Sequence, residues 1–120
     1  MEKGYKRLKV YQEAHKLVKE IYIITEKFPK SELFGLISQM RRCVVSIVAN
    51  ILEGQARSGL KEFRQFLYIA NGSLVELEYY LELSSDLKYI TKEQYEKMEN
   101  QRIIVGSLLG GFIKYLKRDA

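Results

Sequence analysis

Residues that close disulfides, bind metals or interrupt helices are scarce in this chain of 120 residues, which has one cysteine, one histidine and one proline. The single cysteine, Cys43, excludes an intrachain disulfide, and its apolar neighbours predict an inert core thiol. The single histidine, His15, excludes the two Glu-x-x-His motifs of carboxylate-bridged two-metal bundles. We therefore predict no metal, no cofactor and a cytoplasmic protein with a reduced thiol.

Patterns for export and membrane insertion are also lacking. The first ten residues carry charge without an apolar stretch, so we do not expect a secretory signal. The longest apolar run, "IIVGSLLGGFI" at 103–113, is well below the roughly 20 residues of a membrane span. With 47% hydrophobic and 29% charged residues and no low-complexity tract, the composition predicts one globular domain over residues 1–120 without a membrane partner.

Helical periodicity runs through nearly the whole chain. Apolar residues alternate at spacings of three and four, which predicts helices at about 8–27, 31–54, 58–86 and 91–118. Phe28-Pro29 ends the first helix, Gly54 ends the second, and Thr91 with Gln94 fits a capping box for the fourth. The third seam is the most regular and contains Phe63, Leu67, Ala70, Leu74, Leu77 and Leu81. Because the joints are short, we predict an all-α, up-down-up-down antiparallel four-helix bundle.

A polar stripe interrupts the apolar stretch "RRCVVSIVANILEG". Its members lie within an arc of roughly 80° and are Arg42, Ser46, Asn50 and Glu53. One interpretation is a solvent-facing stripe on an otherwise buried helix. The other is a buried network, in which Arg42 pairs with Glu76 or Glu78 while the serine and the asparagine bond to neighbouring groups.

The second and fourth helices are apolar over more of their surface than one core requires. The apolar arc of the second helix covers roughly 240°. The fourth helix has further apolar residues outside its core seam, which are Ile103, Ile104, Leu108 and Ile113. Such surfaces promote aggregation unless they are covered. We therefore predict a homo-oligomer with contacts at Val45, Val48, Ile104 and Leu108.

Charge is distributed unevenly along the predicted bundle. The net charge is +5, and one end collects basic residues from both chain ends and from the joint after the second helix. These candidate nucleic-acid-binding residues are Lys3, Lys6, Arg7, Lys9, Arg57, Lys61, Arg64, Lys114, Lys117 and Arg118. The nearby Tyr5, Tyr11 and Tyr115 are candidates for stacking on bases. Such an end attracts RNA or DNA by a salt-sensitive term, although an ordinary solvated surface or an acidic protein partner fits the same charge.

Catalytic constellations are not recognisable. His15 has no identifiable nucleophile, and Glu76 and Glu78 are two residues apart, so they point to different sides of a helix. The glycines lack a phosphate-binding pattern. We predict that the protein is not an enzyme, and we keep two functions open: a ring that binds nucleic acid or a nucleoprotein, or a protein-interaction scaffold.

Motifs in order along the chain suggest a family. They are Phe28-Pro29, Phe34-Gly35-Leu36, Arg41-Arg42, Ser46-Ile47, Asn50-Ile51, Glu53-Gly54, Glu62-Phe63, Phe66-Leu67 and Gly72-Ser73-Leu74. With these motifs the chain resembles the four-helix-bundle proteins encoded in intervening sequences of bacterial 23S rRNA genes, also called ribosomal protein S23-like. It is also similar to the accessory variability protein of diversity-generating retroelements.

The resemblance implies a ring, usually a homopentamer, of otherwise poorly defined function. It also implies partners such as nucleic acid or a reverse transcriptase. The chain departs from the family's pattern at Val48, where proline is common, and at Leu52, where a small residue precedes Glu-Gly. We therefore expect a straighter second helix.

Overall fold

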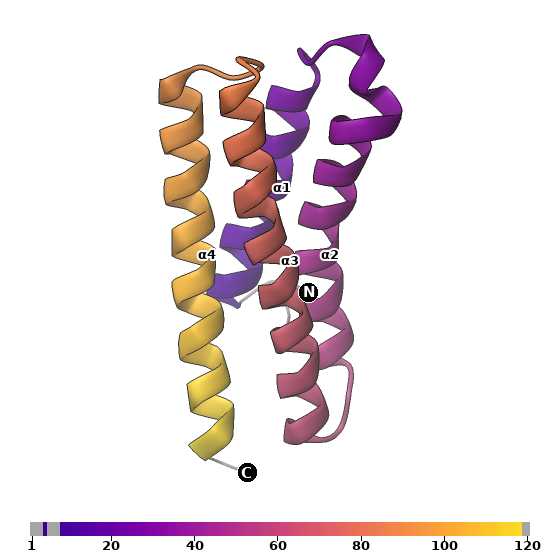
Figure 1. Cartoon of the computed structure of the whole chain (residues 1–120). Coiled ribbons are helices and arrows are strands. Elements are labelled where there is room, and N and C mark those ends of the chain that lie inside the picture. Colours follow the sequence, from indigo (N-terminus) through magenta and orange to yellow (C-terminus); the bar gives the residue numbers. More distant parts are fainter. Residues whose placement is uncertain (1–3, 5–7, 119–120) are drawn as a thin grey trace.

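Four antiparallel helices account for most of the part of the chain that the computed structural model describes, which is residue 4 and residues 8–118. They are α1 (Lys9–Thr25), α2 (Ser38–Gln55), α3 (Leu60–Asp86) and α4 (Lys92–Arg118). Each helix packs against its neighbours in the chain, and α1 closes the bundle against α4 (Figure 1). The described residues form no strand, and the prediction of an all-α, up-down-up-down bundle is confirmed.

The core is built from the apolar seams of all four helices. Its large, fully buried side chains are Leu17, Ile21, Met40, Val44, Ile47, Ile51, Leu67, Leu74, Leu77, Leu81, Met98 and Leu109. Each such side chain contributes about 1.5–3 kcal/mol on burial, so this one core provides most of the stabilisation of the bundle. Helix propensity alone would not hold these helices in water, because isolated helices are marginally stable.

The fourth helix begins as predicted but buries a different set of residues. The backbone N–H of Thr91 donates to Gln94 Oε1 at 2.8 Å, and the N–H of Gln94 donates to Thr91 Oγ1 at 3.1 Å, which completes the capping box. Ile113, predicted to be spare apolar surface, is buried in the core. Gln101 is also buried, and its Nε2 donates to the carbonyl oxygen of Glu13 at 3.0 Å. This bond lets a polar side chain occupy a core position.

The entry to α2 differs from the continuous helix predicted from residue 31. A 3-10 turn, η2 (Lys30–Glu32), is followed by a π-helical turn, η3 (Leu33–Ile37), with non-helical backbone at Gly35 (φ −111°, ψ −111°). The extra residue in a π turn shifts the register, so Leu33, which lies within the helix predicted from residue 31, is exposed. Phe34 beside it is 91% exposed, which makes it the most exposed large hydrophobic side chain of the described residues.

Gly54 has a different role from the predicted end of α2. The helix continues to Gln55, and no glycine of the described residues has a positive φ. A Cβ added at Gly54 would lie 2.7 Å from Phe63 Cδ1 and 2.9 Å from Phe66 Cβ. The glycine is therefore required by the close packing of α2 on α3.

The first helix is much shorter than the third and fourth. It has 17 residues against 27 in each of α3 and α4, or about 25 Å against about 40 Å. Because Glu13 lies beside Gln101, in the middle of α4, the start of α1 lies halfway along the bundle (Figure 1). Lys9 is therefore not at the end where α4 finishes, and its placement with the basic end was wrong. Lys3, Lys6, Arg7 and Tyr5 lie outside the described residues.

Candidate functional site

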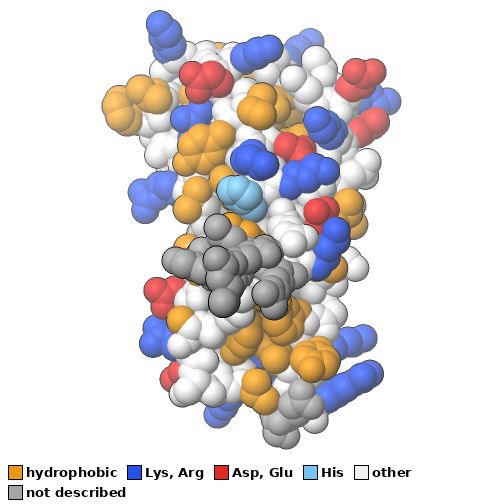
Figure 2. All heavy atoms as spheres, turned by 180° about the vertical axis from the view of Figure 1, so that it is seen from behind, with side chains coloured by type: hydrophobic (Ala, Val, Ile, Leu, Met, Phe, Trp, Pro, Cys, Tyr) orange, Lys and Arg blue, Asp and Glu red, His pale blue; other side chains and the backbone are white. Residues whose placement is uncertain are grey.

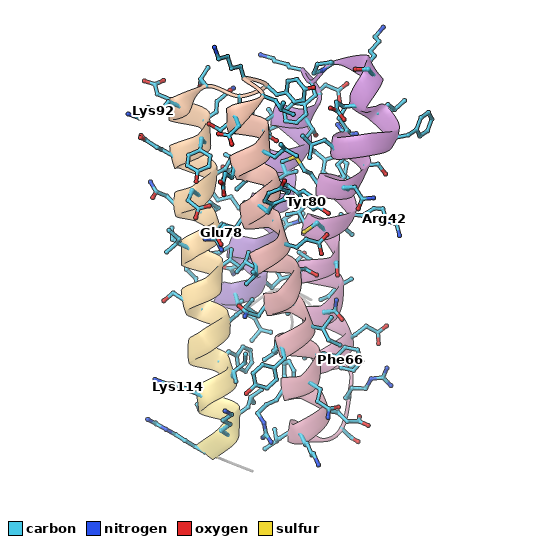
Figure 3. The ribbon with its side chains drawn as sticks, in the orientation of Figure 1. Arg42, Phe66, Glu78, Tyr80, Lys92 and Lys114 are labelled. Atoms are coloured by element: carbon cyan, nitrogen blue, oxygen red, sulfur yellow. The ribbon has the colours of Figure 1, made fainter. Side chains whose placement is uncertain are left out.

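Six basic side chains lie at one end of the bundle, around the joint between α2 and α3 and the end of α4. We call this set the basic end; its members are Arg57, Lys61, Arg64, Lys114, Lys117 and Arg118. The joint after α2 positions Arg57, the first turns of α3 position Lys61 and Arg64, and the last turns of α4 carry the other three. Figure 3 shows Lys114 projecting outward near the end of α4. Cations in the last turn of α4 also stabilise its dipole.

Contacts within the basic end hold some of these side chains and leave others free. Arg57 pairs with Glu53 at 3.1 Å and stacks over the ring of Phe66 at 5.0 Å. Arg64 Nη1 donates to the carbonyl oxygen of Leu116 at 3.4 Å, which ties α3 to α4. The remaining four, Lys61, Lys114, Lys117 and Arg118, are exposed and form no ion pair with any described carboxylate. They remain available to an anionic partner.

The electrostatic asymmetry of the bundle persists in the structure. Residues 53–64 and 110–118 carry six basic and two acidic side chains. Residues 20–36 and 76–100, at the opposite end, carry ten acidic and five basic ones. A field of this kind orients a charged partner toward the basic end.

An aromatic residue that was missed in the sequence lies beside the basic end. Tyr68 on α3 is 47% exposed, and Lys117 Nζ lies 5.8 Å from the centre of its ring. It follows Arg64 by four residues, so helical spacing offered a signal. Of the predicted stacking residues, Tyr115 is exposed near this end. Tyr11 lies on the first turn of α1, away from this end, and stacks on His15.

The predicted ion pairs of the polar stripe do not form. Arg42 is exposed and has neither a hydrogen bond nor an ion pair with the described residues, and Figure 3 shows it pointing away from the bundle. Glu78 instead pairs with Arg102 at 2.9 Å, so the predicted pair with Arg42 was wrong. Glu76 accepts the hydroxyl hydrogen of Tyr80 at 2.7 Å, although it lines the same shallow polar groove as Arg42. The outer edge of the stripe is therefore solvent-facing.

The inner part of the stripe is a network between α2 and α3. Asn50 Nδ2 donates to the carbonyl oxygen of Ser46 at 2.8 Å and to its Oγ at 3.1 Å. Ser73 Oγ donates to Ser46 Oγ at 3.0 Å, and Cys43 Sγ donates to the carbonyl oxygen of Ser73 at 2.9 Å. Each of the two interpretations thus describes part of the stripe.

Titratable groups beside this network are held in their neutral forms. Burial, followed by the charge of Glu76, raises the pKa of the Cys43 thiol to about 12. The hydrogen bond to Glu76 raises the pKa of Tyr80 to about 12. A protonated thiol is a poor nucleophile, so Cys43 is chemically inert near neutral pH.

The predicted oligomer residues divide between two sides of the molecule. Val45 is 41% exposed and Val48 is partly buried, and both line an apolar hollow of about 210 Å³ with His15, Val18 and Leu52. Ile104 is 44% exposed, whereas Leu108 packs partly against the core. Both follow the α1-facing Gln101 at helical spacing, so they lie on the α1 side of α4.

The described residues contain no group of three or more histidine, cysteine, aspartate or glutamate side chains placed to hold a metal ion. The helical segment Lys30–Gln55 is long and apolar enough to span a membrane. That is weak evidence, because a core helix passes the same test and this segment contributes several core residues.

Comparisons with known proteins agree with this architecture. Residues 6–111 match the family described as 23S rRNA-intervening sequence protein. The chain is similar to the crystal structure of a protein of unknown function from the S23 ribosomal protein family of Bacteroides thetaiotaomicron VPI-5482. The two are 31% identical with a TM-score of 0.79, over 88% of this chain and 95% of that one. No curated protein matches the chain.

Proposed function

This chain belongs to the 23S rRNA-intervening sequence protein family, and we propose that it is a non-enzymatic, ring-forming bundle that binds nucleic acid through its basic end. The observation that carries this proposal is the convergence of six basic side chains from three segments on one end of the bundle. Phosphates bind such an end because contact with lysine or arginine releases condensed counterions, whatever the base sequence. The proposal includes a cytoplasmic location.

A ring strengthens this interaction. In one basic end, the cations without an ion pair to a described carboxylate are Lys61, Lys114, Lys117 and Arg118. Four positive charges give a single subunit only a modest attraction for nucleic acid. Cyclic symmetry with parallel bundles repeats them along one rim, and linked contacts raise affinity without new chemistry. The exposed apolar side chains on α1 and α2 are available for the subunit contact. A pentamer is the subunit number that the family resemblance implies.

The test is binding of single-stranded and duplex RNA and DNA by fluorescence anisotropy across a salt series. The variant carries Lys61→Glu, Lys114→Glu and Lys117→Glu, three exposed positions of the basic end. We expect wild-type affinity to fall steeply with salt, with a logarithmic slope of about 0.7–0.9 per phosphate contact, and the variant to lose binding.

A matched control has the same charge change at the opposite end. It carries Lys27→Glu, Lys30→Glu and Lys92→Glu, which are also exposed. We expect it to retain most of the affinity, because its changes lie far from the basic end compared with a Debye length of about 10 Å at 0.1 M salt. Equal losses in both variants would mean that net charge alone matters. Absence of binding by the wild type at low salt would reject the nucleic-acid function.

The alternative is a protein-interaction scaffold that does not bind nucleic acid. It would use the exposed Phe34, a phenyl ring 91% exposed on a π-helical turn, which a different protein would then cover in place of a neighbouring subunit. A ring that ignores every nucleic acid but retains a protein ligand in pull-downs would move the assignment to this function.

A further inference from the structure

Two opposite sides of the bundle each carry several exposed apolar side chains. We call them the α1/α2 face, around Tyr22, Phe34 and Val45, and the α3/α4 face, around Tyr68, Val75, Tyr79 and Ile103. In a bundle whose helices follow one another around the axis, the side shared by α1 and α2 is opposite the side shared by α3 and α4. One copy therefore presents two separate apolar surfaces.

The α1/α2 face is hollowed. Tyr22, Phe34 and Val45 line a depression of about 430 Å³, and Val45 also borders the apolar hollow of about 210 Å³ next to it. Figure 2 shows orange side chains beside the pale blue histidine, among many blue lysine and arginine side chains. A partner surface with protruding apolar groups fits such a face.

The α3/α4 face is the apolar surface along the seam between those helices. Val75 is 55% exposed, and Tyr79, one turn further along α3, is 59% exposed. Ile103 is 54% exposed and lies between Glu99 and Gly106 on α4. Both of those neighbours are on the α3 side of α4. Glu99 forms an ion pair with Arg102, which also pairs with Glu78 of α3. A Cβ added at Gly106 would contact Leu74 of α3.

In the half of the bundle near the joint between α3 and α4, the charges of the two faces are opposite, whereas the half of the α3/α4 face around Tyr68 carries Lys117 and belongs to the basic end. Arg42 lines the larger hollow of the α1/α2 face, and Lys19 lies one turn from both His15 and Tyr22; neither cation has an ion pair among the described residues. On the α3/α4 face, Glu78, Glu82 and Glu99 surround Tyr95. Burial is the largest cause of the raised pKa of Tyr95, and these three carboxylates add to it. Asp86 extends the acidic surface by one further turn.

We propose that the subunit contact is head-to-tail, with the α1/α2 face of one copy packed on the α3/α4 face of the next. With the bundles parallel, as the proposed ring requires, pairing a face with its own copy would bring like charges together, whereas the unlike pairing places Arg42 and Lys19 opposite carboxylates. A contact between two different faces repeats at every subunit, and it forms a ring when the rotation from one subunit to the next closes, with all the basic ends on one rim when the bundles are parallel. The inference rests on the ring of the proposed function and specifies its interface.

The test uses one acidic substitution on each face, Val45→Glu and Val75→Glu, with mass measured by light scattering. Both positions are exposed in the subunit, so the fold should survive, which circular dichroism checks. We expect a wild-type multiple of 14.1 kDa and a single-chain mass for each variant, because a carboxylate is costly in an apolar contact.

Mixing the two variants gives the decisive result. Each retains the face that the other has lost, so an equimolar mixture should form a 1:1 dimer of twice the single-chain mass and stop there. Ile23→Glu and Ile104→Glu are the controls, since both side chains are exposed but lie outside the two faces. Both control variants should keep the wild-type mass. If Ile104 instead lies in the subunit contact, as the sequence analysis predicted, the Ile104→Glu variant should dissociate.

Each failure has its own meaning. A wild-type oligomer that survives both Val45→Glu and Val75→Glu, or a mixture that stays monomeric, overturns the assignment of faces and leaves the ring standing. One variant that dissociates while the other does not points to a face paired with itself and also overturns it. A monomeric wild type rejects the ring itself.

Discussion

Replacing Gly54 with alanine tests the closest helix contact in the bundle. The added Cβ would lie 2.7 Å from Phe63 Cδ1 and 2.9 Å from Phe66 Cβ. The phenyl ring of Phe63 can rotate, but the Cβ of Phe66 is fixed to the backbone of α3, so the helices must separate. Overpacking of this kind costs typically about 1–3 kcal/mol. The gain from replacing glycine in a helix is at most about 1 kcal/mol, and less here because Gly54 is next to the last residue of α2.

We expect Gly54→Ala to lower the free energy of unfolding by about 1–2 kcal/mol, which corresponds to a decrease in Tm of roughly 3–8 °C. Chemical and thermal unfolding followed by circular dichroism measure it, at one protein concentration because assembly also affects Tm. Gly111→Ala is the matched control, because nothing lies within 4 Å of its added Cβ on α4. It should stabilise by about 0.5–1 kcal/mol. Two variants shifted in the same direction would refute the argument from packing.

Other predictions concern the core, a cap and pH. Leu17→Ala removes a fully buried side chain and should cost about 2–5 kcal/mol in denaturant unfolding; a cost below 1 kcal/mol would contradict its central place in the core. Thr91→Ala removes the acceptor of the Gln94 N–H and should cost about 0.5–2 kcal/mol, while an unchanged midpoint would show that the cap contributes nothing. Because Cys43 and Tyr80 have raised pKa values in the folded state, the stability they contribute is complete below pH 9 and is lost as pH rises toward 12. Each contributes a slope of at most about 1.4 kcal/mol per pH unit, and a Cys43→Ser, Tyr80→Phe double variant that shows the same alkaline loss would contradict this assignment.

Local spacing was sufficient for much of the fold. Apolar residues three and four apart specify which side of a helix is buried, so Leu74 and Leu77 could be assigned to the core from the sequence. The capping box at Thr91 was also predictable, because its two bonds join residues only three apart. The exposure of Leu33 could not be predicted in this way. The π-helical turn before α2 is stabilised by hydrogen bonds that Glu32 accepts from Leu36 N and from the hydroxyl of Tyr89, which is far away in the sequence.

The candidate site shows the same division. Helical order predicted that Lys61 and Lys114 would meet at one end, but the displacement of Lys9 followed from the length of α1 relative to α4. The pairing of Glu78 with Arg102 in place of Arg42 depended on which helix lies nearer. Tyr68 follows Arg64 by one helical turn, but its place beside the basic end depends on Lys117, which is far away in the sequence and lies over its ring.

The sequence by itself determined the class of fold, the four helices and the concentration of positive charge at one end. These follow from local periodicity and from chain direction, which short joints impose. Only the tertiary structure decided that Gly54 permits the approach of α2 to α3, that Phe34 is left uncovered and that two apolar faces lie on opposite sides of the bundle. Such features depend on contacts between residues far apart in the chain, where a shift of one residue or a fraction of a turn changes the neighbour.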